Sequence, residues 1–336
     1  MLISIRLTVT IISNQLAIIN EKLKKDYTVA ENKGFTHLHL HSQYSLLDGA
    51  IRFEKLFARC KDLGMDSVAV TDHGNMFGVI EFYTKAIAAG IKPIIGIEAY
   101  IAPNSRLDRT KTSISDAAYH LVLLAQNNVG YQNLLKLAST GYTEGFYYRP
   151  RIDKQILAEL NEGLIVTSAC PKGELAMQMS GGDIKAAQAV AEVYLKIFGP
   201  ERYFIEIQSH ESDDPNIAKS LIDLANKVGA GIVATNDVHF LAQEDHEAHN
   251  CLCAISTGKK ADDPDRMIYP KDVFLKSPAQ MRQLFPDCPQ AFDNTLEIAK
   301  RCNVEIDLKS RHAPHFSPED GSTPEKFLTK LCYEKA

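Results

Sequence analysis

The chain has no excess of positive charge. Its 37 Lys and Arg residues stand against 42 Asp and Glu residues, which gives a formal net charge of −5. This balance argues against a protein that is basic over its whole surface and held to nucleic acid by global attraction. A polyanionic ligand must therefore meet local basic loops or bound cations.

Cysteine is too scarce and too scattered to form a disulfide framework. The 336 residues include seven cysteines, an odd number, at positions 60, 170, 251, 253, 288, 302 and 332. A chain of this length with 45% hydrophobic residues can bury a sizeable core without cross-links. We therefore predict a reducing, cytoplasmic setting.

The sequence also lacks an uninterrupted apolar run long enough for a membrane span. The opening stretch, residues 1–20, is apolar and β-branched, but Ser13, Asn14 and Gln15 interrupt it and no evident small-x-small cleavage site follows. We predict neither export nor a membrane partner. Residues 21–26 then become charged, so we expect residues 1–33 to form a flexible extension outside the fold.

The middle of the chain alternates strand-like and helix-like segments. Amphipathic stretches at 53–63, 79–89, 184–197 and 216–228 have apolar residues at three- and four-residue spacing, as in helices. Short apolar, β-branched runs predict seven strands, at 35–40, 67–71, 93–101, 120–125, 164–168, 203–208 and 231–235. Repeated strand–helix units imply a parallel sheet, and we predict a distorted α/β barrel with seven strands.

Potential metal ligands recur at or just after the predicted strands. His37, His39 and His41 alternate along the first one, and side chains alternate across a strand. Further candidates follow other apolar runs at Asp72, His73, Glu98, Cys170, His210, Asp237 and His239. Imidazole, carboxylate and thiolate together suit zinc, manganese or iron. The set predicts a site for two or three divalent ions that hydrolyses phosphoesters.

Some of these residues fit a different role better. His120 opens its apolar run, so either that strand is reversed or the preceding loop delivers the side chain. We expect His37, Asp72 and His210 to be outer hydrogen-bond partners of the ligands. Cys251 and Cys253 lie in a predicted helix and are expected to be core residues, and on the same helix His246 and His249 are expected to form a solvated face.

The motifs carry a resemblance to a known superfamily. Residues 37–49 (HLHLHSQYSLLDG), 69–74 (AVTDHG), 96–100 (GIEAY) and 234–239 (ATNDVH) resemble the motifs of the polymerase and histidinol phosphatase (PHP) superfamily. Residues 141–153 (GYTEGFYYRPRID) and 292–304 (FDNTLEIAKRCNV) are similar to segments of the alpha subunits of bacterial DNA polymerase III. This likeness runs from about residue 34 to the end.

The resemblance implies a set of nine metal ligands. They fall on His39, His41, Asp48, His73, Glu98, His120, Cys170, Asp237 and His239. Asp48 enters only through the resemblance, because its Leu-Leu-Asp-Gly context otherwise indicates a turn. Every position holds a suitable donor, so the implied activity is a 3'-to-5' exonuclease that removes misincorporated nucleotides. We expect Asp237, Glu98 and His239 to act in catalysis, and Arg149 and Arg151 to contact the DNA backbone.

The resemblance also implies a domain layout and partners. We predict a PHP phosphoesterase domain at residues 34–300, and at 301–336 a linker with the beginning of the polymerase palm. The acidic residues that bind magnesium for nucleotide addition would lie further on in a full-length protein, so residues 1–336 alone are not expected to polymerise. Implied partners are primer-template DNA, the sliding clamp, the clamp loader and a proofreading subunit, in a bacterial cytoplasm at the nucleoid.

Two alternatives remain open. One is a small-molecule phosphatase of the histidinol phosphate type, which shares the metal motifs but would be expected to end near His239. The other is a non-catalytic scaffold in which bound metal stabilises the domain and a proofreading partner docks.

Overall fold

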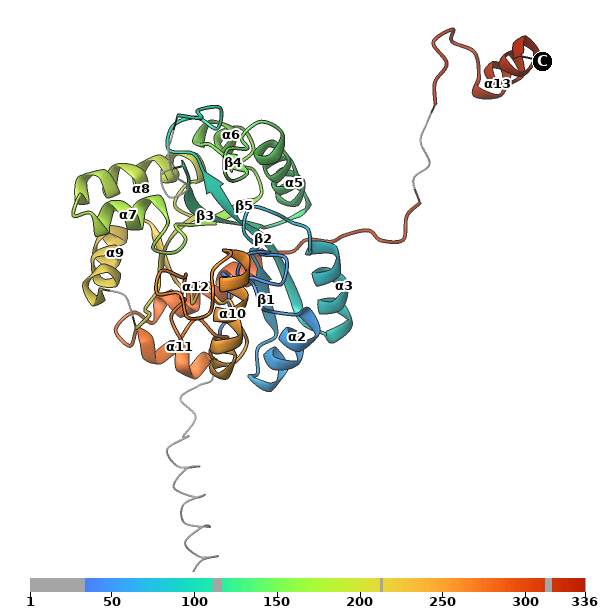
Figure 1. Cartoon of the computed structure of the whole chain (residues 1–336). Coiled ribbons are helices and arrows are strands. Elements are labelled where there is room, and N and C mark those ends of the chain that lie inside the picture. The colour runs from blue at the N-terminus through green and yellow to red at the C-terminus, as the bar shows by residue number, and fades with distance from the viewer. Residues whose placement is uncertain (1–33, 111–116, 212–213, 312–315, 336) are drawn as a thin grey trace, which may run out of the picture. The chain divides into compact units, whose positions relative to one another are not determined.

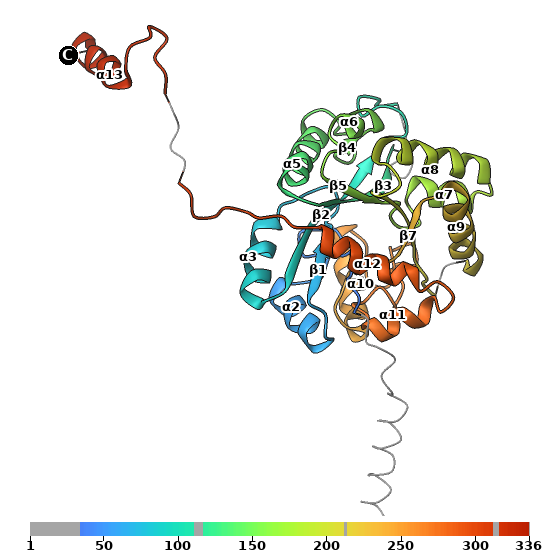
Figure 2. The same ribbon diagram turned by 180° about the vertical axis from the view of Figure 1, so that it is seen from behind.

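A curled, mixed sheet of seven strands forms the centre of the fold, with helices packed around it (Figures 1 and 2). The computed structural model describes residues 34–110, 117–211, 214–311 and 316–335. The predicted extension at 1–33 lies outside these residues. Two compact units are present, one up to Val304 and one from Glu305 onward.

The strand order is β1-β2-β3-β5-β6-β7, and β4 pairs with β2 beside this path. The strands are β1 (Ser67–Val70), β2 (Lys92–Ile101), β3 (Tyr119–Ala125), β4 (Arg151–Ile152), β5 (Leu164–Thr167), β6 (Tyr203–Ile207) and β7 (Gly231–Ala234). Neighbours pair in parallel except at β3, which is antiparallel to both β2 and β5. Of the two alternatives for His120, the structure has the reversed strand, and His120 lies near its start.

The expected first strand, residues 35–40, is an extended segment with a single bridge between Leu40 and Val238. On one side His41 donates its backbone N–H to the carbonyl of Val238, and on the other Ala69 donates to the carbonyl of His37. The ladder is interrupted because Leu40 donates its N–H to the hydroxyl of Thr71 instead of to a backbone carbonyl. The segment thus joins the two edges of the curled sheet without becoming a regular strand.

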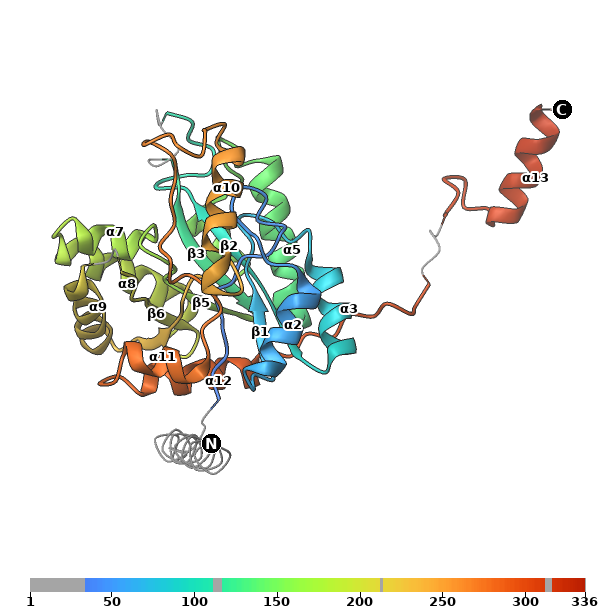
Figure 3. The same ribbon diagram turned by 60° about the horizontal axis from the view of Figure 1, so that its bottom comes forward.

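Helices cover the outside of the sheet, as Figure 3 shows from another side. The described residues of the first unit contain the helices α2 (Phe53–Asp62), α3 (Val79–Ala89), α5 (Asn128–Thr143), α6 (Lys154–Glu159), α7 (Glu174–Ser180), α8 (Ile184–Phe198), α9 (Pro215–Val228), α10 (His246–Ser256), α11 (Pro278–Leu284) and α12 (Gln290–Arg301), with a 3₁₀ turn at Gln243–Asp245. Apolar faces at helical spacing drive this packing, because they bury side chains such as Leu56 and Phe82 against the sheet.

The second unit contains the helix α13 (Pro324–Lys335), and the ring of Phe327 on it lies 5.5 Å from that of Phe316. No helix among the described residues is long and apolar enough to cross a membrane.

Candidate metal centre

The structure brings the nine expected metal ligands into one cluster at one edge of the sheet. Because β3 is reversed, His120 at its start reaches the edge where the parallel strands end. The side chains come from the 35–41 segment and the loop after it (His39, His41, Asp48), from the turn after β1 (His73), from β2 and β3 (Glu98, His120), and from the turns after β5 and β7 (Cys170, Asp237, His239).

Two carboxylates connect the cluster. Glu98, whose side chain is 1% exposed, has its Oε1 at 3.2 Å from His39 Nε2 and 2.9 Å from His120 Nδ1. Its Oε2 lies 2.6 Å from His73 Nδ1. Asp237 Oδ1 lies 3.2 Å from His39 Nε2 and 3.0 Å from His41 Nε2.

The remaining ligands surround these two. Asp48 Oδ1 is 3.3 Å from His73 Nε2. The Cys170 Sγ lies 3.5 Å from His120 Nδ1 and 3.6 Å from Glu98 Oε1. The ring of His41 stacks on those of His73 and His239, at centroid distances of 4.0 and 4.4 Å.

Three histidines are held with the same ring nitrogen directed into the cluster. His39 donates from Nδ1 to Glu206 Oε1 at 2.7 Å, and His239 donates from Nδ1 to the backbone carbonyl of Asp237 at 2.7 Å. His41 donates from Nδ1 to the hydroxyl oxygen of Ser45 at 3.0 Å, because that hydroxyl uses its own proton on Asp72. In each neutral ring the lone pair is then on Nε2, which is the form a metal requires.

The electrostatics of the cluster keep its acids ionised. Burial raises the pKa of Glu98, but the adjacent His120, His39 and His73 outweigh it, so the pKa lies well below its usual range. The pKa of Asp237 is lowered in the same way by His39 and His239 against the effect of burial.

His41 is held neutral. Burial, followed by repulsion from His73 and His239, lowers the pKa of His41 to about 3. Its imidazole is therefore uncharged at neutral pH, as a metal ligand must be.

Strained backbone occurs beside the cluster. Asp237 has a φ of 44° and Ala169, which precedes Cys170, has a φ of 62°. Left-handed backbone is costly for residues other than glycine and persists where the surrounding structure enforces it, often at functional sites. Here the left-handed backbone at Ala169 and Asp237 directs the side chains of Cys170 and Asp237 into the cluster, directly after β5 and β7.

A cavity of about 400 Å³ opens over one side of the cluster. Asp48, His73 and His120 line it, together with Arg149 and Lys172. The guanidinium of Arg149 lies 5.6 Å from the centre of the Tyr100 ring. Two cations therefore flank the route to the cluster, where an anion would approach.

The three residues expected to act in catalysis differ in access. The Asp237 side chain is 14% exposed, whereas those of Glu98 and His239 are each 1% exposed. Only Asp237 among them offers appreciable surface to a substrate.

The three expected outer partners lie in different places. Asp72 accepts from the hydroxyls of Ser42 and Ser45 and so reaches His41 through Ser45. His37 is bonded through Nε2 to the carbonyl of Lys276, and His210 Nδ1 lies 3.6 Å from Asp272 Oδ2.

Arg151 does not support the expected DNA contact. It is 1% exposed, and its guanidinium donates to the carbonyls of Gly145, Ala117, Arg106 and Asp108. The side chain holds the surrounding loops together and is not available to a ligand.

Two functional neighbours were not identified from the sequence. His249 was expected on a solvated helix face, but it is 1% exposed and its Nε2 donates to the carbonyl of Asp48. Glu206 is buried in β6 and accepts from His39. A signal for Glu206 was present, because it is the one charged residue in the apolar run Tyr203–Ile207.

Comparisons with known proteins show what the chain is similar to. The family model for the PHP domain matches residues 37–210. The chain is 44% identical over 302 residues to DNA polymerase III subunit alpha of Treponema pallidum, covering 89% of this chain and 26% of that protein. The subunit alpha of Thermus aquaticus is 43% identical over 310 residues, with 89% and 25% covered. The chain thus spans about a quarter of the length of these relatives.

Among solved structures, the chain is similar to a two-domain protein from Bacteroides vulgatus that contains a predicted PHP-like metal-dependent phosphoesterase. The TM-score is 0.40 at 13% identity, with 83% of this chain and 72% of that one covered. The family model and the subunit alpha relatives confirm the resemblance seen in the motifs. The chain belongs to the PHP domain family.

Proposed function

We propose that the cluster holds two or three divalent ions, zinc, manganese or iron, and that the domain is a metal-dependent phosphoesterase. One observation carries this proposal: seven buried polar atoms of the cluster make no hydrogen bond of suitable geometry, although most of them lie close to another ligand atom. They are His39 Nε2, His41 Nε2, Asp48 Oδ1, His73 Nδ1, Glu98 Oε2, Asp237 Oδ1 and His239 Nε2. Unpaired buried polar atoms are costly, and a cation would satisfy all of them together.

Ions bound there would make hydroxide available near neutral pH and neutralise charge on a phosphoryl group. The chain's own residues have separable roles. Arg149 and Lys172 receive the anionic substrate in the cavity that Asp48, His73 and His120 line. Asp237 is the most exposed of the three residues assigned to catalysis, and the buried Glu98 and His239 hold the ions in place. His120 and Cys170 complete the ligand set beside Glu98 Oε1.

We propose further that the substrate is the 3' end of primer-template DNA and that the reaction is proofreading by a 3'-to-5' exonuclease. The similarity to polymerase III alpha subunits supports this choice. A full-length protein of that kind would add nucleotides with magnesium in a region beyond residue 336. It would meet the sliding clamp, the clamp loader or a proofreading subunit in the bacterial cytoplasm at the nucleoid. Residues 34–300 would be the phosphoesterase domain, and 301–336 the linker and start of the palm.

Two other functions have an observation in their favour. The near-complete burial of Glu98 and His39 suits a structural metal, so the domain would then be a scaffold that docks a proofreading partner. The cavity of about 400 Å³ would also admit a small phosphomonoester such as histidinol phosphate.

The test is an assay on primer-template DNA with a labelled 5' end and a mismatched 3' end. The 336-residue chain is incubated with manganese, with zinc, or with chelator, beside Asp237→Asn and the control Asp223→Asn, which alters an exposed aspartate on α9. We expect metal-dependent shortening from the 3' end by the wild type and by Asp223→Asn, and none by Asp237→Asn.

An intact primer beside folded, metal-loaded wild-type protein would contradict the exonuclease. Phosphate release from histidinol phosphate by that protein would then favour the phosphatase, and its absence would favour the scaffold.

A further inference from the structure

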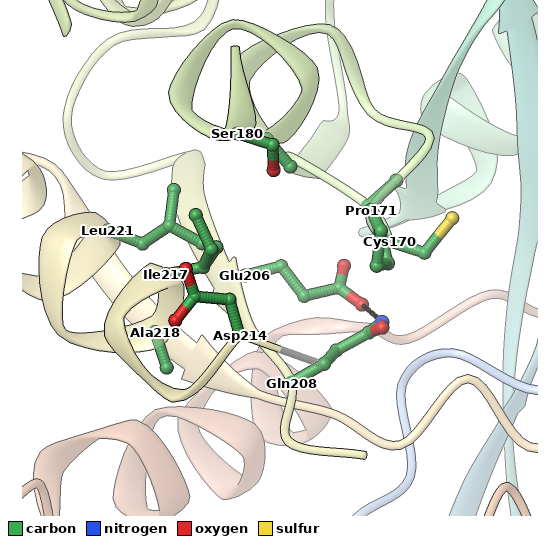
Figure 4. A pocket seen from close by; sticks show the side chains of 11 residues that line it. Cys170, Pro171, Ser180, Glu206, Gln208, Asp214, Ile217, Ala218 and Leu221 are labelled. Carbon is green, nitrogen blue, oxygen red and sulfur yellow. Dashed lines mark hydrogen bonds between the residues drawn. The ribbon is translucent and has the colours of Figure 1, made fainter. Parts of the chain in front are cut away.

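Glu206 is a buried carboxylate directly behind the metal cluster. It is the fourth residue of β6, is 2% exposed, and is surrounded on its strand by apolar side chains. Figure 4 shows its carboxylate directed toward the end of Gln208, and Glu206 lines a cavity of about 270 Å³ between α7 and α9. A carboxylate at such a place requires hydrogen-bond donors around it.

Four donors surround this carboxylate. Oε1 accepts from His39 Nδ1 at 2.7 Å, from Gln208 Nε2 at 2.8 Å and from the hydroxyl of Thr235. Oε2 accepts from the hydroxyl of Thr167. The hydroxyl and amide groups come from the end of β5 and from the residues directly after β6 and β7, so the ends of three strands fix the position of the carboxylate.

This arrangement determines the state of His39. A carboxylate only accepts hydrogen bonds, so Nδ1 keeps its proton, and in the neutral ring that a metal requires the lone pair faces the cluster from Nε2. That Nε2 lies 3.2 Å from both Glu98 Oε1 and Asp237 Oδ1, the two carboxylates that connect the site. His39 is fully buried, so water does not compete for its ring nitrogens.

We propose that Glu206 is a positioning residue, which orients His39 and increases the basicity of its Nε2 toward a divalent cation. The inference rests on the proposed metal-binding function and assigns a role to a residue outside the nine ligands. An acidic partner behind a ligating histidine fixes the tautomer and strengthens the bond to the metal.

The other two histidines with this orientation have weaker partners. His41 donates to the hydroxyl of Ser45, and His239 donates to the backbone carbonyl of Asp237. Both acceptors are uncharged, whereas Glu206 gives its histidine a full negative charge. Among these three histidines, His39 is therefore the one whose Nδ1 donates directly to a charged acceptor.

The experiment measures zinc binding by titration calorimetry on the metal-free 336-residue chain, in the wild type, Glu206→Gln and Glu206→Ala. The control is Glu174→Gln, which alters a buried glutamate on α7 that pairs with Lys154 and Tyr194 away from the cluster. Long-range ¹H–¹⁵N spectra of histidine-labelled protein report which ring nitrogen of His39 carries the proton. Zinc alone is the probe, so the readout does not depend on nuclease activity.

We expect Glu206→Ala to weaken zinc binding about 10- to 100-fold and to release His39 from its single tautomer. Glu206→Gln keeps an acceptor but loses the charge, so a smaller, measurable loss is expected with the tautomer retained. Glu174→Gln should bind zinc like the wild type. If Glu206→Ala does not fold, Glu206→Gln decides the question.

Wild-type zinc affinity in Glu206→Gln would overturn the proposal. Equal losses in Glu206→Gln and Glu174→Gln would also overturn it, because the effect would then be one of general stability. A wild-type chain that binds no zinc would contradict the proposed metal site itself, and the positioning role would fall with it.

Discussion

At the scale of single residues, Arg149 and Arg151 show how two neighbours with the same chemistry can have opposite roles. Arg149 lines the cavity over the cluster and lies against the Tyr100 ring. Arg151 starts β4, is buried, and donates to four backbone carbonyls. Arg149 lies in the loop before β4, so the loop and not strand alternation sets the direction of its side chain.

We expect Arg149→Ala to change the free energy of unfolding by less than about 0.5 kcal/mol while weakening substrate binding. Arg151→Ala should cost about 3 kcal/mol or more, because it leaves four carbonyl acceptors without their donor. Urea unfolding and the KM for DNA measure the two effects. Equal stability of the two variants would contradict the interior role of Arg151.

The burial of His37 leads us to predict a specific pH dependence of the free energy of unfolding. Burial lowers its pKa to about 4, against about 6.5 in the unfolded chain, and the Lys276 carbonyl opposes this shift only in part. Between these two pH values His37 is protonated in the unfolded chain but not in the folded one. The contribution of His37 to stability is therefore fully present above pH 6.5 and is lost as the pH falls toward 4.

We expect the wild type to lose about 3 kcal/mol more than His37→Gln between pH 7 and pH 4, at about 1.4 kcal/mol per pKa unit. Glutamine keeps a donor for the Lys276 carbonyl and has no proton to gain. Denaturant unfolding in the presence of chelator measures the difference, and parallel pH profiles for the two proteins would refute it.

Single residues also show where sequence reasoning reached its limit. His39, His73 and Asp237 could be predicted as members of one cluster, because the end of a strand is visible in an apolar pattern. Asp48 could be predicted as a ligand only through the resemblance, because its Leu-Leu-Asp-Gly context is equally typical of an ordinary turn. The burial of His249 depends on α10 folding over the Asp48 loop, a tertiary contact that no local pattern encodes.

At the scale of elements, the predicted strands at 67–71, 93–101, 120–125, 164–168, 203–208 and 231–235 correspond closely to β1, β2, β3, β5, β6 and β7. The direction of β3 was left open, because strand direction is a matter of connections and not of composition. Residues 35–40 have the composition of a strand but form no regular ladder, because the Leu40 N–H bonds to the Thr71 hydroxyl and not to a backbone carbonyl. The two residues of β4 are too few to give a pattern.

A substitution at Gly96 in β2 tests how closely β2 packs against the reversed strand β3. A Cβ atom there would lie 2.6 Å from the Leu123 carbonyl oxygen on β3 and 2.7 Å from the Leu124 side chain. We expect Gly96→Ala to lower the free energy of unfolding by about 1–3 kcal/mol and to weaken metal binding, because Glu98 lies two residues further along β2.

The control is Gly181→Ala, where a Cβ would meet nothing closer than 3.4 Å. It should leave both stability and metal binding near wild type. Chemical denaturation and metal titration of the two variants measure this, and an unaffected Gly96→Ala protein would count against the β2–β3 packing.

At the scale of the whole molecule, the cluster joins segments that lie far apart in the sequence. Its side chains come from both edges of the curled sheet and from the segment at residues 35–41 that connects them. Metal bound there would cross-link this segment to β2, β3 and the turn after β7. Binding and global stability should therefore be coupled.

Zinc or manganese at about 100 times its dissociation constant should stabilise the folded chain by about 2.7 kcal/mol. Chelator should remove this gain, and His39→Ala should reduce it. Thermal unfolding monitored by circular dichroism is the measurement, and a rise in Tm on the order of 5 °C is expected. A Tm that is unchanged by metal would indicate that the cluster binds no ion.

The most direct test of the account is anomalous X-ray diffraction from crystals of the chain grown with manganese or zinc, recorded on both sides of the absorption edge of the metal. The account predicts two or three anomalous peaks enclosed by His39, His41, His73, Glu98 and Asp237. Anomalous density absent from this cluster, in crystals that contain the metal elsewhere, would contradict it.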